Sequence, residues 1–120
     1  MNSLPSRPRE ALPNLRGEDE AELSYLANLI ETSSFILLSS AHPTCVLGAV
    51  PRPPDVHSAY CASLYSMGKG GIKCLELGPE YGANRKDALR GLLERVEKEI
   101  GSMMVRDEKK KDRERERERR

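Results

Sequence analysis

The sequence predicts a single small α+β domain, in which two helices flank a small antiparallel sheet built on one hairpin. Three observations predict this class. Apolar residues recur at helical spacing in residues 18–31 and again in residues 85–103, and a glycine-rich turn joins two strand-like runs between them. A sheet with one face covered by both helices is the most economical arrangement of these elements. A chain of 120 residues supports one such domain.

Composition divides the chain into three segments. Residues 1–17 contain three prolines and no apolar periodicity, which predicts a disordered Pro-rich head. Residues 18–104 form the α+β domain. Residues 105–120 form a charged tail with nine of the 20 Lys and Arg residues and six of the 19 Asp and Glu residues. The rest of the chain therefore carries a net charge of −2.

The first helix is expected over residues 18–31. Its acidic opening, Glu18, Asp19 and Glu20, lies where the positive end of the helix dipole favours anions. Its apolar positions have the spacing of one helical face. They are Leu23, Leu26, Ala27 and Ile30.

Two strands are expected next. The apolar run at residues 35–39 suits either a short buried strand or an extension of the helix, and its serine-rich flanks favour the strand. Pro43 biases His42 away from helical geometry and predicts a turn. Residues 45–50 are the second strand, which the proline-rich residues 51–55 end. A P-x-x-P match at residues 51–54 is interpreted as a rigid linker, with a polyproline II ligand as the alternative.

The hairpin is expected to pair residues 58–67 with residues 72–77. The four residues between them include three glycines, which can adopt the positive φ angles of a tight turn. The same glycines suggest a phosphate loop, but the spacing of that motif is absent and strands flank the turn on both sides. A second Gly- and Pro-containing run, residues 78–82, is expected to end the hairpin.

The last helix is expected over residues 85–103. Asn84 suits the N-cap, and Asp87 lies three residues on, where a carboxylate stabilises the first turn. Its apolar stripe consists of Leu89, Leu92, Leu93, Val96, Ile100 and Met103. We expect this stripe to pack on the domain's own sheet; its spacing of threes and fours leaves self-association through a coiled coil as the alternative.

No membrane segment, metal site or cofactor is expected. The longest strongly apolar run has four residues, whereas a membrane span needs about 20. His42, Cys45, His57 and Cys61 are of zinc-ligand type, but a strand from residue 57 to residue 61 would separate its ends by roughly 13 Å. The cysteines, which include Cys74, are odd in number, so we expect free, buried thiols in a reducing compartment, cytoplasmic or nuclear.

Residues 84–100 resemble the last helix of a double-stranded-RNA-binding domain, a family whose element order is helix, three strands, helix. In that family a K-K-x-A-K run at the start of the helix contacts phosphates. Arg85, Lys86 and Ala88 match this run, whereas Leu89 stands where the final lysine belongs. The resemblance implies phosphate contacts from Arg85 and Lys86, although the negative charge outside the tail does not favour them.

The sequence favours a non-catalytic protein-interaction or accessory module that binds a protein partner or a second copy of itself. No nucleophile, base and stabiliser converge in the sequence, so neither an enzyme nor a small-molecule substrate is expected. The alternative is a nucleic-acid-binding module, since the alternating Arg and acidic residues of the tail resemble tracts in nuclear RNA-processing proteins. Its candidate contacts are Arg85, Lys86, Lys109, Lys110 and Lys111.

Overall fold

The computed structural model describes residues 19–38 and 42–119, so the predicted head lies outside the described residues. The predicted α+β class is confirmed. In chain order, with η marking a short 3-10 helix, the elements are α2 (Glu20–Ser34), β1 (Thr44–Ala49), η2 (Val56–Ser58), β2 (Tyr60–Met67), η3 (Lys69–Gly71), β3 (Lys73–Gly82) and α3 (Arg85–Arg119).

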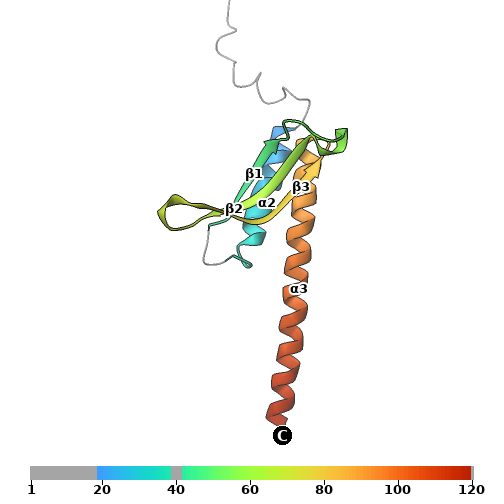
Figure 1. Ribbon diagram of the computed structural model, residues 1–120. Helices are drawn as coiled ribbons and strands as arrows, with labels where there is room; N and C mark the ends of the chain where they lie inside the picture. Colours follow the sequence, from blue (N-terminus) through green and yellow to red (C-terminus); the bar gives the residue numbers. More distant parts are fainter. Residues whose placement is uncertain (1–18, 39–41, 120) are drawn as a thin grey trace, which may run out of the picture.

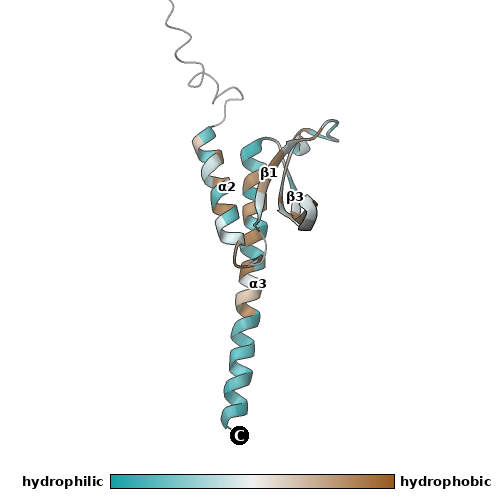
Figure 2. Ribbon diagram, turned by 90° about the vertical axis from the view of Figure 1, so that its left-hand side faces the viewer, coloured by the Kyte–Doolittle hydropathy of each residue, from teal (hydrophilic) through white to brown (hydrophobic). Residues whose placement is uncertain are grey.

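The molecule has two layers. The three strands form one antiparallel sheet in the order β1-β2-β3, and β2 pairs with both of its neighbours. Both helices lie side by side on one face of this sheet, as Figures 1 and 2 show from two directions. Helix, three strands and helix is also the order that the resemblance to a double-stranded-RNA-binding domain implied.

Asp19 caps helix α2, and its side chain accepts hydrogen bonds from the backbone N–H groups of Ala21 at 2.9 Å and Glu22 at 3.3 Å. The predicted end of this helix at residue 31 is wrong, because α2 continues to Ser34. The strand predicted over residues 35–39 is wrong for the residues described, 35–38. The N–H groups of Leu37 and Leu38 donate to the carbonyl of Ser34 at 2.9 Å and 3.0 Å, which holds the segment as a turn after the helix. Its backbone is bonded locally, so it pairs with no strand.

The hairpin turn is confirmed, because Gly70 and Gly71 have φ angles of 77° and 76°. The predicted end of the second strand is wrong, since β3 continues to Gly82 through a cis Gly78–Pro79 bond. Gly78 has a φ of 103°, and a Cβ there would lie 2.9 Å from Ser63 Oγ. Pro79, which has no N–H to donate, lies between Leu77 and Glu80, where a register shift interrupts the pairing of β3 with β2.

Helix α3 begins as predicted, with Asn84 Oδ1 accepting from the N–H of Asp87 at 2.8 Å. Its predicted end at residue 103 is wrong, because the helix runs for 35 residues to Arg119, about 52 Å. The Lys, Arg and Glu residues of the tail have high helix propensity, and neither Pro nor Gly interrupts them. Residues 104–119 are all exposed, so this part projects from the domain (Figure 1).

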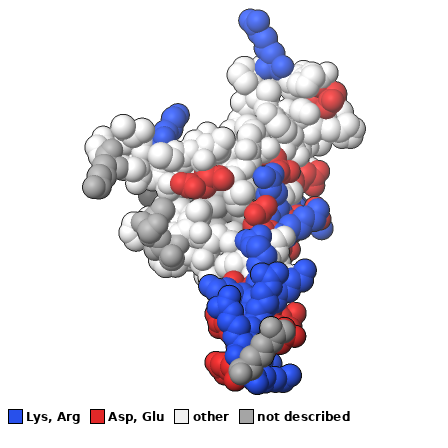
Figure 3. Space-filling model, turned by 60° about the horizontal axis from the view of Figure 1, so that its bottom comes forward, with Lys and Arg blue, Asp and Glu red and all other residues white. Residues whose placement is uncertain are grey.

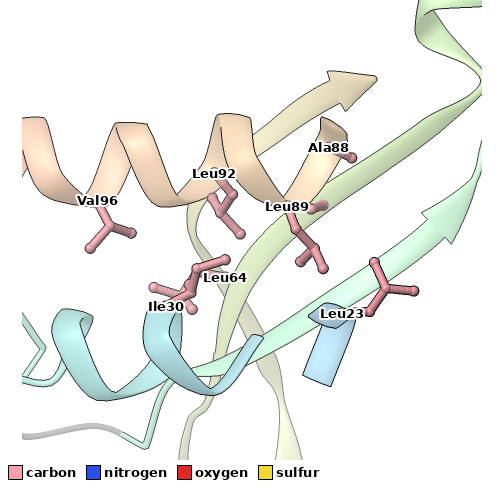
Figure 4. Close-up of a cluster of buried hydrophobic side chains, with 8 residues drawn as sticks. Leu23, Ile30, Leu64, Ala88, Leu89, Leu92 and Val96 are labelled. Atoms are coloured by element: carbon pink, nitrogen blue, oxygen red, sulfur yellow. The ribbon is translucent and has the colours of Figure 1, made fainter. Parts of the chain in front are cut away.

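The core lies between the two helices and β2 (Figure 4). Its buried apolar members are Leu23 and Ile30 of α2, Ala62 and Leu64 of β2, and Ala88, Leu89, Leu92 and Val96 of α3. The predicted apolar stripe of the last helix thus packs on its own domain, as the favoured interpretation required.

In the part of the chain that the structure describes, no helix combines the length and apolar character needed to cross a membrane.

Candidate protein-docking surface

Neither α2 nor α3 lies on the face of the sheet that points away from them, and no other described element covers that face (Figure 2). Side chains alternate between the two faces of a strand, so the residues between the core positions point outward. We call this surface the outer face. The strand register aligns its members across the sheet, and they include Thr44, Val46, Cys61, Tyr65, Met67, Lys73, Leu75 and Tyr81. Ser63 has the same register but is buried beside Gly78.

The outer face is largely apolar. Four large side chains on it are 44–62% exposed. They are Val46, Met67, Leu75 and Tyr81. Apolar side chains gathered on one surface, as opposed to scattered singly, mark sites of interaction with another molecule. The buried apolar side chains of both helices all belong to the core on the opposite face.

A hollow of about 400 Å³ opens on the outer face. Its lining consists of Thr44, Val46, Tyr65, Ser66, Met67 and Lys73. The ammonium group of Lys73 lies 5.8 Å from the centre of the Tyr65 ring, within the range of a cation–π contact. Among the described residues, Lys73 forms no salt bridge. The hollow therefore combines apolar side chains with one cation that forms no salt bridge among the described residues, and Ser66 in its lining donates a hydrogen bond to Glu76 at 2.5 Å.

The structure places Arg85 and Lys86 away from this surface, at the first turn of α3. Arg85 forms an ion pair with Glu20, and Lys86 Nζ lies 3.3 Å from Glu22 Oε2. Both carboxylates belong to the first turn of α2, so these ion pairs join the two helices. A phosphate at this place would have to displace a carboxylate from each cation.

The other predicted contacts, Lys109, Lys110 and Lys111, lie on the projecting part of α3. Twenty-four residues separate Lys109 from Arg85, which corresponds to about 36 Å along the helix. The structure therefore does not bring the five predicted contacts together. Lys109 and Lys110 lie on one side of the helix, whereas Lys111 faces another side.

The described residues contain no group of three or more His, Cys, Asp or Glu side chains that could hold a metal ion. The three cysteines are free, but the expectation that all are buried is wrong, because Cys45 and Cys61 are half-buried and Cys74 is exposed. Cys74 lies at the start of β3, where the hairpin extends beyond the helices (Figure 1). Burial, and secondarily the negative charge of Glu31, raises the pKa of the Cys45 thiol to about 11.

Sequence reasoning missed the outer face as a site. The alternation of side chains along residues 60–67 was available in the sequence as a signal for it. However, alternation only divides the residues between two faces. It does not indicate which face the helices leave open.

No family model matches this chain, and comparisons with curated proteins and with solved structures also find no match. The fold and the outer face are therefore the basis for an argument about function.

Proposed function

We propose that this protein is a non-catalytic interaction module, and that a short apolar segment of a partner protein, with a carboxylate near it, docks on the outer face. The observation that supports this proposal is the uncovered apolar surface of Val46, Met67, Leu75 and Tyr81. Covering it removes apolar area from water at about 25 cal/mol per Å². This gain drives association without any catalytic group.

The dimensions of the outer face favour a short segment as the occupant. The outer strands lie about 10 Å apart, and β2, with eight residues, is about 26 Å long. This footprint is well below the roughly 800 Å² per partner of a standard interface between folded proteins. A single extended strand or a single helix has the width to fill it.

Lys73 supports the choice of an acidic segment. It is aligned with Met67 across the hairpin and lies at the rim of the hollow. A carboxylate on the partner would pair with this cation while a neighbouring apolar side chain enters the hollow. Because the ammonium group is exposed, the pair contributes to orientation more than to affinity.

Selection of random peptides displayed on phage against the full chain tests this proposal. We expect the enriched peptides to combine apolar and acidic residues. They should bind wild-type protein and lose binding to the Val46→Glu variant. The matched control is Val56→Glu, since Val56 is 73% exposed but lies in η2, outside the outer face.

Two results would contradict the proposal. Enriched peptides that bind Val46→Glu and wild type equally well would place the docking surface elsewhere. A monomer–dimer equilibrium in sedimentation that Val46→Glu abolishes would make a second copy the occupant instead of a partner segment.

A further inference from the structure

Continuation of α3 through the tail creates a surface that the alternating sequence does not display. Five basic side chains of the tail are spaced i, i+3, i+4, i+7 and i+11, so they share one face of the helix. We call this set the basic stripe. It consists of Arg106, Lys109, Lys110, Arg113 and Arg117, all exposed and all lining one surface hollow. Figure 3 shows Lys and Arg side chains gathered along this part of α3.

The acidic residues of the same segment lie outside the basic stripe. Glu114 borders it and lines the same hollow. Asp107, Glu108 and Asp112 line a different hollow together with Lys111 and Arg115. Arg115 is 4.0 Å from Asp112, whereas none of the five stripe residues forms a salt bridge within the described part of the chain. The five cations therefore share one face of the helix, which Glu114 borders on one side and Glu116, three residues after Arg113, borders on the other.

We propose that the basic stripe binds the phosphate backbone of duplex nucleic acid without reading its sequence. The stripe extends about 16 Å along the helix. A duplex carries one negative charge per about 1.7 Å of its axis, so a stretch of this length presents many phosphates to five cations. Three of the five cations are arginines, whose planar guanidinium groups pair with phosphate through two donors.

Other features of α3 argue against three alternatives, namely insertion into the major groove, binding of single strands and insertion into a membrane surface. A helix inside the major groove, about 12 Å wide, has phosphates on both sides, and Glu108 and Asp112 would then face one wall. Contact from outside the groove avoids this repulsion and leaves the bases unread. Single strands are bound by stacking on aromatic side chains, and α3 contains none. An amphipathic helix that lies in a membrane surface buries an apolar face beside its basic one, and residues 106–119 have no such face.

Fluorescence anisotropy of the full chain with a labelled duplex tests this proposal. One arm uses duplex DNA and another uses duplex RNA of the same sequence, which distinguishes the two sources of phosphate. For five contacts to B-form DNA, the logarithm of the binding constant should fall with the logarithm of salt concentration with a slope of about −4.5.

Two double variants with equal change in net charge give the decisive comparison. Lys110→Gln with Arg113→Gln removes two stripe cations, and the slope should become about 1.8 less steep, with affinity at least about tenfold weaker. Lys111→Gln with Arg115→Gln removes two cations that lie on another side of the helix, and slope and affinity should stay close to wild type. Far-UV circular dichroism checks that both variants keep the helix. Lys110→Arg with Arg113→Lys keeps both charges and should bind like wild type.

Three results would overturn the proposal. Equal losses in both Gln variants would attribute binding to net charge and not to the stripe. The second result is an absence of measurable binding to either duplex at low salt. The third is tighter, stripe-dependent binding of polyglutamate than of either duplex, which would make an acidic protein the ligand.

Discussion

The side chain of Glu31 in α2 accepts a hydrogen bond from the backbone N–H of Cys45 in β1, at 2.8 Å. This bond connects α2 to β1, an edge strand of the sheet that pairs only with β2. It also places a negative charge beside the Cys45 thiol. A single carboxylate thus influences both the stability of the sheet edge and the titration of a cysteine.

Replacing Glu31 by Ala should destabilise the domain by about 1–2 kcal/mol, because a partly buried N–H loses a charged acceptor. Glu31→Gln keeps a carbonyl oxygen as acceptor and should recover most of this loss. Urea denaturation followed by circular dichroism measures both free energies of unfolding. Equal unfolding midpoints for wild type and Glu31→Ala would show that the bond contributes nothing.

The three thiols should react at very different rates with iodoacetamide. Cys74 is exposed and should be modified quickly near neutral pH, whereas Cys45, with its pKa raised to about 11, should react only at high pH. Mass spectrometry of the modified peptides measures each rate. Modification of Cys45 as fast as that of Cys74 at neutral pH would contradict the buried environment of Cys45.

The same raised pKa predicts how stability depends on pH. The folded state favours the neutral Cys45 thiol, so its contribution is fully present below the unfolded pKa of 9.0. The contribution is lost as pH rises from 9.0 to about 11. Comparison of wild type with Cys45→Ala over this range isolates the effect. Identical loss of stability in both proteins would assign the pH dependence to other groups.

Replacing Gly82 by Ala should destabilise the domain, whereas replacing Gly91 or Gly101 by Ala should stabilise it. A Cβ on Gly82 would lie 2.8 Å from Asp87 Cβ in the first turn of α3, so Gly82→Ala should cost about 1–3 kcal/mol. A Cβ on Gly91 would meet Glu80 Cβ at an ordinary 3.5 Å, and one on Gly101 would meet nothing within 4 Å. Alanine at either helical position should stabilise the domain by up to about 1 kcal/mol. Thermal unfolding distinguishes these signs.

Ending the chain after Val105 should leave the melting temperature of the domain nearly unchanged. Residues 106–119 are exposed, and the core residues of α3 end before them. The truncated protein should lose far-UV helix signal in proportion to the missing residues, and it should lose affinity for duplex nucleic acid. A melting temperature well below that of the full chain at equal concentration would mean that the tail stabilises the domain or an oligomer.

Local sequence determined where the helices begin and where the hairpin turns. Three features depend only on contacts between residues a few positions apart. They are the Asn84 cap of α3, the apolar spacing of both helices, and the glycines at residues 70 and 71. Such contacts are present in the sequence pattern itself, so these predictions are confirmed. The α+β class followed from them.

Residues 35–38 have the composition of a strand, but local bonds from Leu37 and Leu38 to Ser34 hold them as a turn after α2. Tertiary structure decided other features, among them the bond from Glu31 of α2 to the edge of β1. β3 continues past residue 78 because Gly78 fits against β2, which is a contact between distant segments. The open side of the sheet depends on where both helices pack. The basic stripe, in contrast, depends on the local helix propensity that continues α3 to Arg119. Periodicity assigns residues to faces, but only the packing of distant elements determines which face is covered and which is left to a partner.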